Sequence, residues 1–245
     1  MIQPGFLHRV RLIEDHGQDT GAKVTLDVLS TDPDTLFPLQ GALGYDIAQN
    51  LFIAPNNLVV EGTSDFTYLD LISRHLESLT GRTPLDDSWT IVPVGGVDLI
   101  PTFIALLGTH LNLGVLIDSK KGGTQKISRL ANQRYIARSN IVTIGQILSR
   151  SQADIEDLFD PQDYLDLYNG AFGKKPRASV LKGKDPIVKQ IARAEGIDNF
   201  DHGKPADFLL RNRDTILPNL KQKTIDNFES LFKKLNSILA SFGKT

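Results

Sequence analysis

Short apolar runs alternate with helical patterns through the middle of the chain. Four runs have the length and apolar content of strands: residues 57–61, 90–94, 113–118 and 141–144. Between them, leucine and isoleucine recur at helical spacing, or the segment is apolar over several turns, which predicts helices over residues 65–79, 97–111 and 124–134. Strands that alternate with helices favour a parallel sheet with right-handed crossovers.

The pattern of apolar and polar residues at the two ends of the chain differs from that of the middle part. Near the N-terminus we expect a short strand over residues 9–13 and an amphipathic helix over 36–48. After residue 160 the strand signals vanish, and helices are predicted at 160–168, 185–191, 205–217 and 223–239. The predicted fold class is α/β, with a mostly parallel sheet flanked by helices and followed by a small all-helical domain. We divide the chain into a lead-in packed on the core (1–50), an α/β domain (51–159) and a helical domain (160–245).

Composition excludes several kinds of function. The 245 residues include no cysteine, so disulfides, thiolate zinc sites and cysteine nucleophiles are excluded. No apolar run approaches the roughly 20 residues of a membrane-spanning helix, and the N-terminus lacks the form of a signal peptide. We therefore expect a cytoplasmic protein with no membrane contact.

Charge is unevenly distributed along the chain. The formal net charge is −2, but residues 1–159 carry 12 Lys+Arg against 18 Asp+Glu, and residues 160–245 carry 15 against 11. An acidic half beside a basic half suits a metal centre next to a surface that binds phosphate. The alternative is that solvated faces merely differ in charge.

Carboxylates follow the first, third and fourth predicted strands. Glu61 ends the first strand, and Asp65 follows one turn into the next helix. Asp118 ends the third strand. Past the fourth strand, an acidic turn contains Asp154, Glu156 and Asp157, which Ser151 could cap. Because the C-terminal ends of parallel strands share one edge, we expect these acids to meet there.

Oxygen ligands at one edge suit Mg²⁺ or Mn²⁺. Glu61, Asp65, Asp118, Asp154 and Glu156 are the candidate ligands, and they could hold two ions about 4 Å apart that clamp the attacking and leaving oxygens of a phosphodiester. The alternative for Asp65, Asp154 and Glu156 is that acids in the first turn of a helix favour its dipole. Asp157 is the weakest candidate.

These motifs resemble the Toprim domain of topoisomerases, primases and several nucleases. The resemblance rests on Val60-Glu61-Gly62, Asp65, the glycine turn Val94-Gly95-Gly96, and Asp118. The longer runs resemble nucleases of the overcoming-lysogenization-defect (OLD) family, probably class 2, over about residues 30–240. They are Leu58 to Asp65, Val92 to Asp98 with Pro101-Thr102, and Ala153 to Phe159.

The resemblance implies a C-terminal nuclease region that cuts DNA with two metal ions. In that family an ABC-type ATPase region precedes it, and no Gly-x-x-x-x-Gly-Lys-Ser/Thr loop occurs in this chain. The implied partners are DNA and such an ATPase region, through which the protein could form a homo-oligomer. One departure stands out, because the family's Asp-x-Asp is here Asp118-Ser119-Lys120, and protonated lysine cannot ligate Mg²⁺. Either Asp154 or Glu156 substitutes, or metal affinity there is low.

A basic stretch in the helical region provides candidates for nucleic-acid binding. Five residues in and around a loop are expected to contact phosphates without sequence preference: Lys174, Lys175, Arg177, Lys182 and Lys184. The resemblance also implies a helical-domain lysine near the metals, for which Lys189 is the candidate. For any one of these lysines the alternative is a solvated helix residue. His202 could shuttle protons or simply cap a loop.

The leading hypothesis is a metal-dependent DNA endonuclease in which Glu61 also acts as general base. One rival is another Toprim activity, of the topoisomerase or primase type; strand passage needs a nucleophilic tyrosine, and Tyr135, Tyr164 and Tyr168 show no recognisable signature. The other is a catalytically weak or inactive DNA-binding module. Trp89 is expected in the core.

Overall fold

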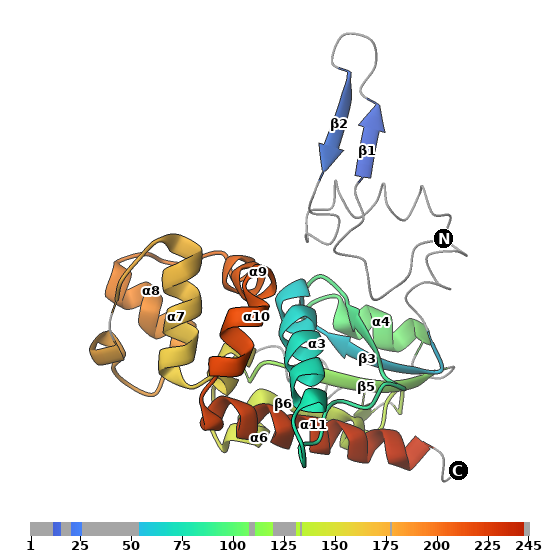
Figure 1. Cartoon of the computed structure of the whole chain (residues 1–245). Helices are drawn as coiled ribbons and strands as arrows, with labels where there is room; N and C mark the ends of the chain where they lie inside the picture. Colours follow the sequence, from blue (N-terminus) through green and yellow to red (C-terminus); the bar gives the residue numbers. More distant parts are fainter. Residues whose placement is uncertain are drawn as a thin grey trace.

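A four-stranded parallel sheet forms the centre of the molecule in the computed structural model (Figure 1). The structure describes residues 12–15, 21–25, 54–107, 111–119, 131–132, 134–176 and 178–242. The strands lie in the order β4-β3-β5-β6, with β3 and β5 in the centre. Their bounds are Asn56–Val60 (β3), Thr90–Pro93 (β4), Asn112–Ile117 (β5) and Ile141–Thr143 (β6).

Helices cover both faces of the sheet. Alternate residues point to opposite faces of a strand, so Leu58 and Val60 join one core cluster while Val59 joins another. Helices α3 (Thr63–Ser78) and α11 (Gln222–Phe242) pack on the first face. Helix α4 (Ile100–Leu107) packs on the second (Figure 1). This arrangement confirms the predicted α/β fold with a parallel sheet.

The chain after β5 contains further short and long helical elements, of which η2 precedes β6 and the others follow it. They are η2 (Arg138–Asn140), α6 (Ile144–Leu148), η3 (Ile155–Leu158), α7 (Pro161–Phe172), η4 (Ala178–Val180), α8 (Ile187–Glu195), α9 (Gly203–Arg211), α10 (Arg213–Ile216) and η5 (Leu217–Asn219). Helix α9 packs against α7 and α3, and α11 packs against α3, α6 and β5. One apolar cluster runs from the sheet into these helices. The division into three domains stays a prediction.

One predicted helix is broken. The prediction of a single helix over residues 205–217 was wrong, because the chain forms α9, α10 and η5 in succession. Asn212 ends α9 with its side-chain amide donating to the carbonyl of Phe208, at 2.9 Å. The same carbonyl also accepts the backbone N–H of Asn212 at 3.1 Å, and the backbone of Asn212, with φ of −115° and ψ of 20°, then leaves the helical range. The amphipathic pattern continues across this break, so the sequence does not indicate it.

Salt bridges fasten α11 to the loop that follows α3. Arg82 lies 2.7 Å from a carboxylate oxygen of Glu229, and the backbone N–H of Thr83 donates to the other oxygen at 3.1 Å. Asn236 adds two bonds to the same loop, to Pro84 and Asp86. Trp89, which follows in the chain, is buried as predicted. The C-terminal helix is therefore an integral part of the packed core.

The N-terminal part includes a two-stranded antiparallel sheet of β1 (Leu12–Asp15) and β2 (Ala22–Thr25). The predicted helix over 36–48 and most of that over 124–134 lie outside the described residues, as does Lys120. No helix in the described ranges combines the length and apolar character needed to cross a membrane.

Candidate functional site

Glu61 ties together the ends of three neighbouring strands. It follows β3 directly, and its carbonyl accepts a hydrogen bond from the Gly96 N–H after β4, at 2.7 Å. Its side-chain Oε1 accepts one from the Asp118 N–H at the end of β5, at 2.9 Å. The turn after β4 needs its glycines, because Gly95 and Gly96 have φ angles of 85° and 130°. At the predicted edge of the sheet, the ends of β3, β4 and β5 are thus joined through hydrogen bonds to Glu61.

Asp118 and Ser119 fasten this edge to the acidic turn that precedes α7. Asp118 Oδ1 accepts a hydrogen bond from the Ile155 N–H at 3.1 Å. The Ser119 N–H donates to the carbonyl of Ala153 at 2.8 Å, and its buried hydroxyl accepts from the Gly145 N–H at 2.7 Å. These bonds span 26 to 37 residues of sequence, so only the tertiary fold could bring the third strand end to the acidic turn.

Asp65 belongs to the same group of acids. It lies in the first turn of α3, and its Oδ2 accepts a hydrogen bond from the Gly62 N–H at 2.8 Å. The pKa of Asp65 is raised to about 7, mainly by burial and in part by the negative charges of Glu156 and Glu61, against the opposing effect of this hydrogen bond. A carboxylate whose pKa responds to two others lies close to both. Asp65 therefore joins the acids of the first strand end to those of the acidic turn.

The acidic turn itself forms the short helix η3. Asp154 occupies its N-cap and is buried, and Glu156 is 2% exposed. The Nδ1 atom of His202 lies 2.8 Å from Glu156 Oε1, across 46 residues of sequence. The imidazole stacks on Phe200, with ring centroids 5.4 Å apart. His202 is therefore a part of this site, in contact with a candidate ligand, and the ring beneath it fixes its orientation.

Two tyrosine side chains lie beneath the acids. Tyr68 and Tyr164 are fully buried and adjacent, and neither hydroxyl has a hydrogen-bond partner of good geometry among the described residues. Burial raises the pKa of both hydroxyls well above the usual value, and the charge of Glu156 raises it further. Both stay protonated at neutral pH, so they are O–H donors beside a group of carboxylates. Their burial also removes Tyr164 as a nucleophile, and Tyr168 is equally buried.

Asp157 serves the fold instead of the site. Its Oδ1 lies 2.9 Å from the Arg150 guanidinium and accepts the Ile187 N–H at 3.0 Å, while Oδ2 accepts the Asp154 N–H at 2.8 Å. It thereby joins η3 to the start of α8. The capping role predicted for Ser151 was wrong, because Asp154 and Asp157 form the capping box of this turn.

The donor chemistry of the acids fits Mg²⁺ or Mn²⁺. Among the residues that the structure describes, no three carboxylate or imidazole side chains are grouped closely enough to hold a cation as they stand. The carboxylates nevertheless interact with like charge, because the charges of Glu156 and Glu61 add to the effect of burial in raising the pKa of Asp65. Glu61, Asp65, Asp118 and Glu156 would hold the ions, with Asp154 as a further candidate.

None of the predicted basic residues that the structure describes forms an ion pair with the candidate ligands. Lys175, Lys182 and Lys184 are exposed, Lys174 pairs with Glu195 at 3.3 Å, and Arg177 lies outside the described residues. Lys189 is exposed in the first turn of α8, where its charge helps to lower the pKa of Asp185 after the larger effect of Arg193. No ion pair joins Lys189 to the candidate ligands within the described part of the chain. Its catalytic role stays a prediction.

Sequence reasoning missed the contact of His202 with Glu156 and the two tyrosines beneath. Tyr68 is one helical turn after Asp65, on the buried face of α3. That spacing could have indicated its place below the acids. No local pattern could have indicated the partner of His202, because it lies in a loop before α9.

Comparisons with known proteins give one likeness. No family model and no curated protein matches the chain. Among solved structures, the chain is similar to the C-terminal region of the Burkholderia pseudomallei OLD protein, with 12% identity and a TM-score of 0.39. The match covers 76% of this chain and 100% of that one.

Proposed function

We propose that the protein is a metal-dependent DNA endonuclease that hydrolyses phosphodiester bonds with two Mg²⁺ or Mn²⁺ ions. One observation carries the proposal: hydrogen bonds and charge interactions link Glu61, Asp65, Asp118 and Glu156, from two strand ends, a helix start and the acidic turn. Packing alone does not explain why several acids gather at one place, where Glu156 is buried and Glu61, Asp65 and Asp118 are partly buried. When bound, two such ions supply charge stabilisation for the attacking and leaving oxygens of a phosphodiester.

The chain's own residues have separate roles in this proposal. Glu61 would accept a proton from the attacking group, since it ends a buried strand at the sheet edge where ligands bind in α/β folds. Asp65 is held by the Gly62 N–H, and Asp118 by the Ile155 N–H, so each keeps one oxygen directed by the backbone. His202 holds Glu156 through Nδ1. It is a positioning residue, since it acts through the carboxylate.

DNA and an ATPase region are the proposed partners. The exposed Lys175, Lys182 and Lys184 favour contact with phosphates, whose binding would weaken with salt. The partner ATPase region follows only from the sequence resemblance to OLD nucleases, as does the assignment of Lys189 to catalysis.

Plasmid cleavage tests the proposal. The purified chain should relax or linearise supercoiled plasmid in the presence of Mn²⁺ and leave it intact in EDTA. Glu61→Gln should reduce the rate by at least about 100-fold, because it removes a charge from the centre of the group. Glu77→Gln is the matched control, since Glu77 is exposed on the same helix as Asp65 and far along it. Equal cleavage by Glu61→Gln and the parent would contradict the proposal.

A non-catalytic DNA-binding module is the second candidate. It is favoured by the absence of a ready-made metal group among the described residues and by Lys120, which stands where the family has a second aspartate. Metal-dependent binding of DNA without cleavage, over Mg²⁺, Mn²⁺ and Co²⁺, would support it. Covalent protein–DNA adducts would instead support a topoisomerase activity, which the burial of Tyr164 and Tyr168 disfavours.

A further inference from the structure

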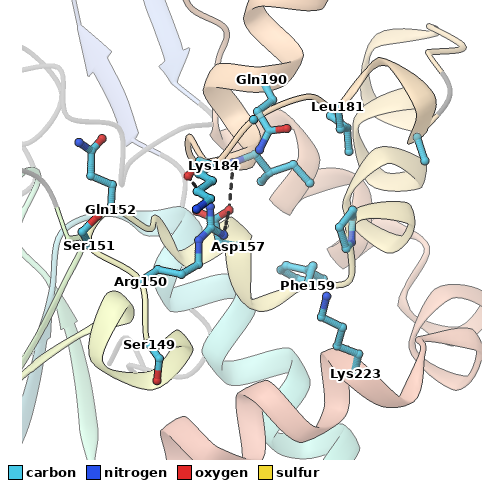
Figure 2. A pocket seen from close by; sticks show the side chains of 14 residues that line it. Ser149, Arg150, Ser151, Gln152, Asp157, Phe159, Leu181, Lys184, Gln190 and Lys223 are labelled. Atoms are coloured by element: carbon cyan, nitrogen blue, oxygen red, sulfur yellow. Dashed lines mark hydrogen bonds and ion pairs between the residues drawn. The ribbon is translucent and has the colours of Figure 1, made fainter.

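A cavity of about 730 Å³ lies beside the acidic turn, between the end of α6 and the helices that follow η3. Among its lining residues are Arg150, Asp157, Phe159, Lys184, Gln190 and Lys223, with Lys184 close to Asp157 and Lys223 close to Phe159 (Figure 2). Figure 2 shows the amino group of Lys223 extending from α11 toward Phe159. The cavity is separate from the group of Glu61, Asp65 and Asp118, none of which lines it.

The cavity has an excess of positive charge. Asp157 is the one carboxylate among its described lining residues, and it is already occupied by Arg150 and two backbone N–H groups. Arg150 donates three hydrogen bonds, to Asp157 and to the carbonyls of Lys184 and Asp185. A guanidinium has five N–H donors, so at least two remain, on a side chain that is 32% exposed.

Lys223 forms no ion pair in the described parts of the chain. The pKa of Asp160 is lowered against the effect of its burial, mainly by Lys221, and the charge of Lys223 adds to this. The neighbours of Lys223 on α11 do form ion pairs: Lys221 lies 2.7 Å from Asp160, and Lys233 lies 2.8 Å from Glu229. Lys184 likewise has no carboxylate within ion-pair distance among the described residues. Lys223 also occupies the first turn of a long helix, where a cation opposes the helix dipole.

Three helices begin at the wall of the cavity. Pro161 is the first residue of α7, Ile187 the first of α8, and Lys223 the second of α11, and all three line it. The N-terminal ends of helices carry partial positive charge, which adds to that of the side chains. The lining therefore matches an anion in both its fixed charges and its backbone dipoles.

We infer that this cavity binds a phosphate group of the nucleic-acid strand, through Arg150, Lys184 and Lys223. The inference rests on the proposed function and extends it by naming where the substrate backbone is held. Residues 150–157 connect the cavity to the acids. Arg150 and Asp157 line the cavity, while Asp154 and Glu156 belong to the group of acids. A strand held in the cavity would place a neighbouring phosphodiester next to the acids. Apolar Phe159 is 1% exposed and serves as floor, since its ring packs on Tyr68 and Phe228.

Binding measured without metal tests this inference separately from catalysis. The probe is a fluorescein-labelled single-stranded oligonucleotide, followed by anisotropy in EDTA with the full chain over a range of salt concentrations. Lys223→Ala and Lys184→Ala should each weaken binding by roughly 3- to 10-fold and reduce the slope of log K against log salt by about 1. Lys234→Ala is the matched control, because Lys234 is exposed on α11 away from the cavity. It should change binding by less than about 2-fold.

The results of this experiment distinguish the inference from its alternatives. Equal weakening by Lys234→Ala and Lys223→Ala would show a general charge effect and overturn the inference, as would a parent chain that binds no oligonucleotide. If inorganic phosphate shifts the thermal midpoint of the parent but not of Lys223→Ala, while the oligonucleotide fails to compete, the cavity serves a small phosphate compound and the inference is wrong. If the parent binds through Lys223 yet never cleaves with Mn²⁺, the cavity assignment stands and the nuclease proposal fails.

Discussion

Glu229 on α11 holds the C-terminal helix against the loop after α3, and its removal gives a measurable stability change. Its carboxylate, 8% exposed, contacts Arg82 at 2.7 Å and Lys233 at 2.8 Å and accepts the Thr83 N–H at 3.1 Å. Glu229→Gln keeps the shape and removes the charge. We expect the variant to fold but to lose the charge-assisted part of these contacts.

The size of the loss follows from the pKa. The lysine and arginine partners lower the pKa of Glu229 from 4.5 to about 2. This difference corresponds to about 3 kcal/mol as an upper bound. Arg82 and Lys233 are 25% and 58% exposed, so water screens the pairs. We expect a net loss of about 1–2 kcal/mol at neutral pH. Because the folded-state pKa is lowered, this stability is present above about pH 4.5 and is lost as the pH falls toward 2.

Urea unfolding of parent and variant at about pH 7 and about pH 3 measures this effect. The difference between them should shrink at the lower pH, because the unfolded chain is then protonated at this position. Asp226→Asn is the control, since Asp226 bonds the same Arg82 at 2.8 Å but is 55% exposed. Its loss should be clearly smaller than that of Glu229→Gln, because solvent screens this exposed pair. A loss for Glu229→Gln that is equal at both pH values, or no larger than the control's, would refute the reasoning.

Three further changes probe packing and the site. Gly170→Ala in α7 would drive a methyl group into the ring of Phe208, so we expect a loss of about 1–3 kcal/mol in urea unfolding, and an unchanged midpoint would contradict that contact. Asp65→Asn should raise metal-free stability at about pH 8 by at least about 1 kcal/mol, with little change near pH 4, because the folded-state pKa of about 7 lies above the usual value and ionisation opposes folding. Calorimetry in EDTA tests this, and destabilisation at the higher pH would count against it. His202→Gln should lower Mn²⁺ affinity by roughly 10-fold, by titration, since it loosens Glu156, while DNA binding in EDTA stays unchanged.

The local pattern predicted much of the fold and the identity of the acids. The apolar runs before Glu61 and Asp118 become central strands, because buried parallel strands need continuous apolar sequence. Parallel strands then share an edge, so the sequence already indicated that Glu61 and Asp118 would approach each other. Their contact at 2.9 Å follows from β3 and β5 being neighbours.

Other features had no local signal. Hydrophobic periodicity continued across Asn212 although the helix breaks there, because the break lies in the backbone angles of Asn212 (φ −115°, ψ 20°), which the pattern does not describe. The acidic turn is capped by Asp154 and not by the predicted Ser151, because Asp157 completes a capping box with Asp154. Which of several polar neighbours makes a cap depends on backbone geometry more than on residue type.

By itself, the sequence determined the alternation of strands and helices, the acids at the strand ends and the basic composition of the helical region. These are properties of residues near one another in the chain. Only the tertiary structure decided that His202 contacts Glu156 and that Lys223 faces the same cavity as Arg150. Such contacts join segments tens of residues apart, and they depend on how whole helices pack, which no local pattern of hydrophobic and polar residues specifies.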